Sequence, residues 1–177
     1  MARQVLLPRE LESRWDNLTG LVQEVDGILL YRSQIDYCLL ETLFVTGVGT
    51  EGHVQALPER IEIANEFFQR NPDYRFVKFH THSKGTINKF GQYYANHFSQ
   101  GDIDGIKNQL KEDRDFIALL ITPETKLLSG IDNPQLVIVS NFSGYAQRSH
   151  TISDAIKLIA RNKGYDISRL SATRRNS

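Results

Sequence analysis

The sequence predicts an α/β domain with a curved, mostly antiparallel or mixed sheet flanked by helices. Stretches with apolar residues at helical spacing alternate along the chain with short runs typical of strands. No internal repeat, low-complexity segment or long linker interrupts them, and a length of 177 residues suits one domain. We therefore expect one domain over residues 1–177, with a core from about 8 to 162 and a frayed tail from about 166 to 177.

The composition argues against several classes of partner and location. Lys+Arg and Asp+Glu both number 21, so no overall charge favours nucleic acid or a membrane surface. Cys38 is the only cysteine, which excludes an internal disulfide and a cysteine-based zinc site and fits a reducing compartment. No apolar run approaches the roughly 20 residues of a membrane span, and Met1–Val5 lacks the apolar core of a signal peptide. We expect a soluble, cytoplasmic protein.

The first third of the chain is predicted to form a helix and then two paired strands. The helix covers 8–18, with proline at an early position and an apolar face that includes Trp15, which we assign to the core. Residues 23–31 and 37–46 have strand composition, and the polar turn between them predicts an antiparallel pair.

A glycine-rich stretch, Thr46 to His53, follows the second strand. Three glycines in this short span cannot hold a rigid shape by themselves, so we interpret it as a mobile connection or a loop that orders on a partner. A helix is predicted next over 58–70, with Pro58 near its first turn and Asn71-Pro72 as its stop. Its expected apolar stripe consists of Ile61, Ala64, Phe67 and Phe68.

Two histidines end the next predicted strand, Arg75–Phe79. Because side chains alternate faces along a strand, His80 and His82 project from the same face and can share one metal ion. Beyond them, 83–98 interleaves basic and aromatic residues, a mixture typical of a peptide groove or a short packed helix. His97 in this stretch is interpreted as a surface residue, with a role beside the site as the alternative.

Ser99 and Asp102 have the spacing of a helix start, with Ser99 as the N-cap and Asp102 in the first turn. The helix dipole favours an ionised acid there, and a metal ligand must be ionised. Two imidazoles and one carboxylate, with a fourth position left to water, form the ligand set of a catalytic zinc site.

The C-terminal part is predicted to contain a helix to Glu112, two buried strands and a last helix. The strands cover 116–121 and 136–139 and are expected in the centre of the sheet, with a loop over 122–135 between them. The last helix covers 152–162, and His150 before it is assigned to the surface.

The order of these groups resembles the JAMM (MPN+) metalloprotease motif: a glutamate on an early strand, then His-x-His, then Ser-x-x-Asp. Glu24, just before the strand containing Gly27, matches the family's early glutamate, with Glu41 as its rival. The plain alternative for Glu24 is a solvent-exposed residue of an edge strand. The chain departs from the family in a longer spacer before Ser99 and in Ser83, which stands where a proline often follows the second histidine.

The resemblance implies an MPN fold and a zinc-dependent isopeptidase or peptidase. One Zn²⁺ per chain would be held by His80, His82 and Asp102 and would activate a water. Glu24 would act as the general base, and Ser99 would donate a hydrogen bond to the oxyanion. The bond cleaved would follow the C-terminus of ubiquitin or a ubiquitin-like modifier. A non-catalytic MPN scaffold and a zinc hydrolase of another amide are the alternatives, and an oligomer or an activating partner is left open.

Substrate contacts are assigned to the two irregular segments, 46–53 and 83–98. We expect substrate binding, and not zinc binding, to depend on both of them. The residues proposed to contact substrate are Gly47, Gly49, Phe90, Tyr93 and Tyr94.

Overall fold

The computed structural model describes residues 4–33, 37–50, 53–124, 126–129, 137–142 and 146–166. Its elements in chain order are β1 (Gln4–Pro8), α1 (Arg9–Thr19), β2 (Val25–Ser33), β3 (Tyr37–Thr50), β4 (His53–Ala56), α2 (Pro58–Arg70), β5 (Tyr74–Thr81), α3 (Lys84–Phe90), α4 (Gln92–Ala95), α5 (Gln100–Glu112), β6 (Ala118–Ile121), β7 (Lys126–Ser129), β8 (Val137–Phe142) and α6 (Ala146–Asn162).

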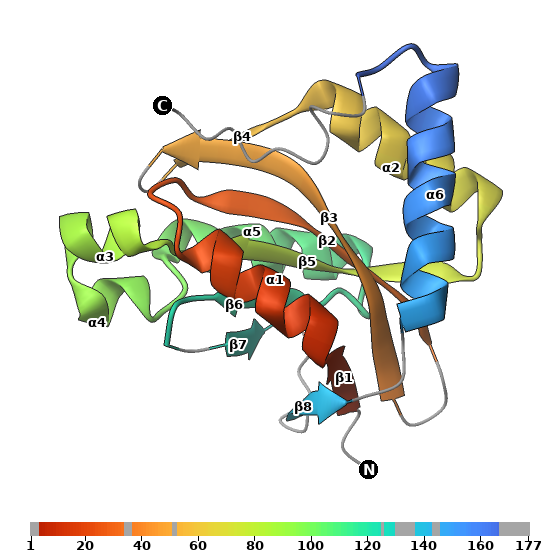
Figure 1. Ribbon diagram of the computed structural model, residues 1–177. Helices are drawn as coiled ribbons and strands as arrows, with labels where there is room; N and C mark the ends of the chain where they lie inside the picture. Colours follow the sequence, from red (N-terminus) through yellow and green to blue (C-terminus); the bar gives the residue numbers. More distant parts are fainter. Residues whose placement is uncertain are drawn as a thin grey trace.

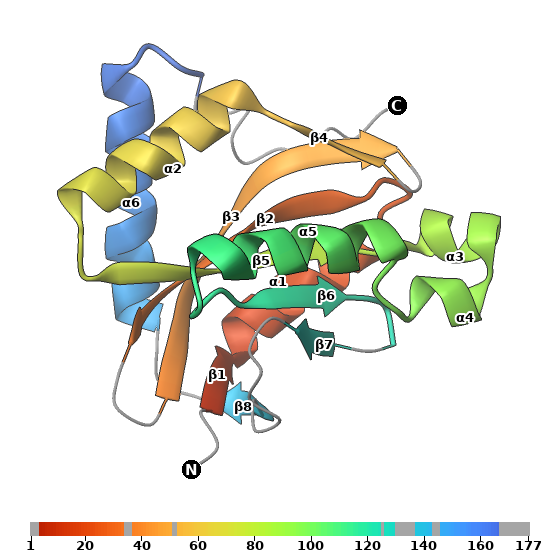
Figure 2. The same ribbon diagram turned by 180° about the vertical axis from the view of Figure 1, so that it is seen from behind.

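The strands form one mixed sheet in the order β7-β6-β5-β2-β3-β1-β8, and β4 pairs with the far end of β3. Among the described strands, three pairs are parallel: β1 with β3, β1 with β8, and β5 with β6. In Figures 1 and 2, α1 and α5 lie on opposite sides of the curved sheet, α2 and α6 lie together at one end, and α3 and α4 lie at the other. The expected mixed α/β architecture, a curved sheet flanked by helices, is therefore confirmed.

The helices are attached to the sheet by buried apolar faces. Trp15 of α1 is fully buried against sheet residues such as Leu29 and Phe79, as predicted. On α2 the apolar face differs from the predicted stripe, because Ile63 is buried with Phe67 while Ile61 is 39% exposed. The α2 face packs with α6 residues, including Ile156, into a second cluster that covers the other side of the sheet.

The glycine-rich stretch is a strand, so the expectation of a non-rigid loop is wrong for its described residues. β3 continues to Thr50, and Gly47 and Gly49 pair with Ala56 and Val54 of β4. A Cβ atom on Gly49 would lie 1.7 Å from the carbonyl oxygen of His53. Glycine is required here for close strand approach. Residues 51 and 52 lie outside the described residues.

Several other elements differ from the predictions. β1 was not predicted, and β7 lies in the expected loop over 122–135. β8 ends the sheet and is not central, and α6 begins six residues early, at Ala146. The side chain of His150 and residues 167–177, most of the expected tail, lie outside the described residues. None of the described helices combines the length and the hydropathy needed to cross a membrane.

Candidate metal centre

His80 and His82 are positioned by β5, which lies between β2 and β6 in the interior of the sheet. His80 is opposite Asp26 on β2 and Leu120 on β6, so its backbone is paired on both sides. His82 follows the last residue of β5, and its backbone N–H donates to the carbonyl oxygen of Ile121, 3.0 Å away. Strand alternation brings the two rings to the same side, with centroids 5.1 Å apart.

Asp102 is positioned by the start of α5, on the segment that faces the histidines. The Ser99 hydroxyl accepts from the Asp102 backbone N–H at 3.2 Å, and Asp102 Oδ2 accepts from the Ser99 N–H at 2.8 Å. This reciprocal pair is a capping box, which confirms the predicted helix start. The box fixes both the carboxylate and the hydroxyl beside the two rings.

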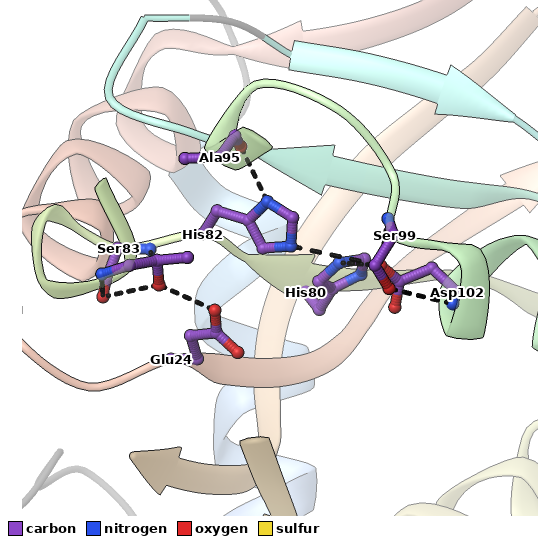
Figure 3. Close-up of polar contacts among 8 residues, drawn as sticks. Glu24, His80, His82, Ser83, Ala95, Ser99 and Asp102 are labelled. Carbon is purple, nitrogen blue, oxygen red and sulfur yellow. Dashed lines mark hydrogen bonds and ion pairs between the residues drawn. The ribbon is translucent and has the colours of Figure 1, made fainter. Parts of the chain in front are cut away.

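The three side chains are arranged closely enough to bind one ion (Figure 3). One donor atom from each of His80, His82 and Asp102 lies within 4.8 Å of the other two. Asp102 Oδ2 is 3.4 Å from Nε2 of His80 and 4.0 Å from Nε2 of His82. Tetrahedral zinc with bonds of about 2.0–2.1 Å places its ligand atoms about 3.3 Å apart, so a small adjustment of the side chains would suffice.

Hydrogen bonding and ionisation also suit a metal site. His82 Nδ1 donates to the carbonyl oxygen of Ala95 at 2.6 Å, which leaves Nε2 with its lone pair facing the cluster. Burial lowers the pKa of His82 and favours the neutral ring that a metal requires. Nε2 of His80 is buried and contacts Asp102 Oδ2 at 3.4 Å, but it makes no hydrogen bond of good geometry within the described part of the chain. An ion would satisfy this atom.

The carboxyl group of Asp102 is held in its ionised form. Its partial burial acts to raise the pKa, but the neighbouring His80 ring and the hydroxyl and N–H of Ser99 outweigh this effect. The pKa of Asp102 therefore lies well below its usual range. An anionic oxygen beside two imidazoles is a suitable donor set for a divalent cation.

Glu24 lies in the same cavity as the cluster. The cavity has a volume of about 350 Å³. Its lining residues are Glu24, Asp26, His53, Val54, Lys78, His80, His82, Thr86, Phe90, Tyr94, Ser99 and Asp102. Glu24 is only 5% exposed and precedes β2, a central strand, so a solvent-exposed edge residue is excluded. Its rival, Glu41, does not line this cavity and accepts a hydrogen bond from the Tyr74 hydroxyl at 2.9 Å.

The proposed substrate residues divide into two groups. Phe90 and Tyr94 line the cavity from α3 and α4, with ring centroids 5.6 Å apart. Tyr93 is 84% exposed, does not line the cavity and stacks on His97. Neither Gly47 nor Gly49 lines the cavity, and the wall on that side comes from His53 and Val54 of β4.

Several residues around the site were missed by sequence reasoning. Lys78 lies two positions before His80 on the same strand face, so strand alternation could have identified it. Asp26 on β2 is paired with His80 on the neighbouring strand β5, and burial raises the pKa of the Asp26 carboxyl group. Ala95 contacts His82 through its backbone carbonyl, and Thr86 contacts Glu24, which is 62 positions away in the sequence. Neither role can be recognised from the neighbouring residues in the sequence.

The segment 83–98 also contributes to the metal cluster itself. Ala95 supplies the acceptor for His82, and the Phe98 ring packs against His80 with centroids 5.8 Å apart. These contacts count against the expectation that this segment serves substrate binding alone.

Comparisons with known proteins assign no family to the chain. The sequence matches no family model and no curated protein. Among solved structures, the chain is similar to the solution structure of protein DSY2949 from Desulfitobacterium hafniense, with 16% sequence identity and a TM-score of 0.47. The match covers 79% of this chain and 95% of the other, and a likeness at this level carries no argument about function.

Proposed function

We propose that this protein is a zinc-dependent isopeptidase or peptidase of the JAMM type, within an MPN domain, that cleaves after the C-terminus of ubiquitin or a ubiquitin-like modifier. The observation that carries the proposal is the convergence of His80, His82 and Asp102 beside a buried glutamate in one cavity. The substrate class rests on the resemblance of these residues and of Ser99 to the JAMM motif.

Zinc is the proposed metal because two imidazoles and one carboxylate, with room for a further ligand, are typical of catalytic zinc sites. When bound, zinc would supply a Lewis acid that polarises the scissile carbonyl and makes a water acidic near neutral pH. His82 is prepared for this role by Ala95, which keeps the proton on Nδ1.

Glu24 and Ser99 have complementary roles in the proposed hydrolysis. Glu24 accepts a proton from the attacking water, whose oxygen bonds to the carbonyl carbon, and delivers the proton to the leaving amine as the C–N bond breaks. The second proton of the water passes from the tetrahedral hydroxyl group to the same amine, so the products are a carboxylate and a protonated amine. Ser99 accepts from the Asp102 N–H, and its own hydrogen, which helps to hold the Asp102 carboxylate ionised, would turn to donate to the developing oxyanion when substrate binds. Losing one such donor costs roughly 10²–10³ in rate.

The test combines metal analysis with a cleavage assay on ubiquitin-like conjugates. We expect about one zinc ion per chain in the purified protein and cleavage that a chelator abolishes. Glu24→Gln should fold, keep its zinc and lose nearly all turnover. Glu41→Gln is the matched control, since Glu41 is equally buried but lies outside the cavity.

Different results would contradict different parts of the proposal. A protein without zinc, or zinc-loaded protein without cleavage of any conjugate, would contradict the assigned activity. Active Glu24→Gln together with inactive Glu41→Gln would transfer the role of general base to Glu41.

A second candidate is a zinc hydrolase of a small amide. The cavity volume of about 350 Å³ is near the lower end of small-molecule sites, and this favours a compact substrate. Cleavage of short acyl amides without cleavage of any protein conjugate would identify this activity.

A further inference from the structure

We propose that Thr86, on α3, is a positioning residue that orients the carboxylate of Glu24 through its hydroxyl group. The proposal rests on the proposed function, because it assigns Glu24 the role of general base. It adds a residue from the segment between the histidines and Ser99, which the JAMM-like pattern itself does not contain.

The contact between the two side chains is short and buried. Thr86 Oγ1 lies 2.7 Å from Glu24 Oε1, and the two residues are 1% and 5% exposed. A buried carboxylate needs hydrogen-bond donors to replace lost water. Thr86 supplies one to Oε1, and Oε2 is left for the reacting water.

The surrounding hydrogen bonds determine which way the Thr86 hydroxyl points. The Ser83 backbone N–H donates to Thr86 Oγ1 at 3.2 Å. Ser83 Oγ donates its own hydrogen to the carbonyl oxygen of Val22 at 2.7 Å, because a carbonyl can only accept. Thr86 Oγ1 also lies 3.3 Å from Ser83 Oγ, but Glu24 Oε1 is the closer acceptor at 2.7 Å, so the Thr86 hydrogen is directed to the carboxylate of Glu24. The chain of donors runs from Ser83 N–H through Thr86 to Glu24.

The backbone around Glu24 is held by other groups, so the Thr86 contact concerns the carboxyl group itself. The Val25 N–H donates to Thr81 Oγ1 at 2.9 Å, and the Glu24 carbonyl accepts from the Gly49 N–H at 3.0 Å. These bonds fix the main chain on both sides of the Glu24 Cα atom. The orientation of the side chain then depends on the partner of its carboxylate.

The expected effect is on turnover and not on substrate or metal binding. Thr86→Val keeps the shape of the side chain and removes the donor, so we expect kcat to fall about 10–100-fold, as for other groups that orient catalytic residues. KM should change less than twofold and zinc should be retained. Thr86→Ser keeps a hydroxyl and should restore kcat to within about threefold of wild type. Thr122→Val is the matched control, a buried threonine whose hydroxyl accepts from the Glu124 N–H and lies outside the cavity.

A double-mutant cycle gives a readout that needs no activity. The free energies of unfolding of wild type, Thr86→Val, Glu24→Ala and the double variant should be non-additive, because the two side chains are in contact. The same cycle with Thr122→Val should be additive. If Thr86→Val fails to fold, Thr86→Ala takes its place in both experiments.

The outcomes separate this inference from the proposed function. Wild type that cleaves no conjugate overturns the proposed function, while the cycle still tests the Thr86–Glu24 contact. Active wild type with an equally active Thr86→Val variant overturns the positioning role. Equal losses of kcat in Thr86→Ser and Thr86→Val also overturn it, because the hydroxyl would then not matter for turnover. An additive cycle would show that the contact between Thr86 and Glu24 contributes nothing to the free energy of unfolding.

Discussion

Single side chains of the cluster make different contributions to metal binding. Nδ1 of His82 donates to the carbonyl oxygen of Ala95, so this ring is held in place by the protein. Nε2 of His80 is buried and makes no hydrogen bond within the described residues, so a metal ion would be its partner. We therefore expect His80→Ala to lower bound zinc from about one ion per chain to a small fraction of this. Elemental analysis after dialysis measures the change.

His97→Ala is the matched control for this measurement. His97 stacks on Tyr93 on the exposed side of α4 and does not line the cavity, so its removal should leave zinc unchanged. A His80→Ala protein with the zinc content of wild type would disprove the ligand assignment.

The ionisation of the cluster predicts a dependence of stability on pH in the metal-free protein. Burial lowers the pKa of His82, so the unfolded chain binds this proton at a higher pH than the folded protein does. The pKa of a histidine in the unfolded chain is about 6.5, so as the pH falls from about 7 to 5, protonation of His82 in the unfolded chain favours unfolding. The lowered pKa of Asp102 affects stability at lower pH. The ionised Asp102 stabilises the folded protein above about pH 3.9, the pKa of an unfolded aspartate, and this stabilisation is lost as the pH falls toward the pKa of Asp102 in the folded protein.

We expect the free energy of unfolding of chelator-treated protein to decrease between pH 7 and 5, measured by urea titration at each pH. His82→Gln should weaken this decrease, because it removes the buried titrating ring. His97→Gln should retain it. An identical slope in the His82→Gln and wild-type proteins would contradict the assignment.

The candidate site was predictable where short-range rules determine it. Strand alternation brought His80 and His82 to one face, and the spacing of Ser99 and Asp102 specified a capping box. Thr86 and Ala95 escaped prediction because they act on residues brought near only by the fold. The choice of Glu24 over Glu41 came from a resemblance, and the cavity lining now supports it.

At the scale of elements, local periodicity predicted the helices better than the strands. α1, α2 and α5 have nearly the predicted bounds because their caps and apolar spacing are local. β1 was missed because its partners, β3 and β8, lie far along the chain. β3 was predicted too short because its glycines suggested a loop, whereas they permit close pairing with β4.

The corrected apolar face of α2 leads to a prediction about stability. Phe67 is 2% exposed and packs edge-on against Phe68 and Tyr74, with ring centroids 5.8 and 5.4 Å away. Phe67→Ala should reduce the free energy of unfolding by about 3–5 kcal/mol. Ile61→Ala, on the exposed side of the same helix, should cost under about 1 kcal/mol. Urea unfolding of both variants is the measurement, and equal losses would mean that the predicted stripe was right after all.

At the scale of the whole molecule, the cavity is assembled from parts that are distant in the sequence. β2 and β5 form its base, α3 and α4 supply the aromatic wall, β4 supplies His53 and Val54, and α5 supplies Asp102. The segment 83–98 contacts both the histidines and Glu24. Shortening it should therefore disturb metal binding as well as substrate binding, contrary to the expectation from sequence.

A metal ion bound across β5 and α5 should also stabilise the entire fold. These elements are joined at the site by His80, His82 and Asp102, and an ion that binds only the folded chain shifts the unfolding equilibrium by mass action. At free zinc about 1,000-fold above the dissociation constant, the expected gain is about 4 kcal/mol. Thermal unfolding with chelator and with added zinc measures this difference. Asp102→Asn should remove most of the gain. Asp104→Asn is the control and should keep it, because Asp104 is exposed on α5 and its described hydrogen bond is with the side chain of Gln100. A zinc-dependent gain of the same size in Asp102→Asn would place the bound ion elsewhere in the protein.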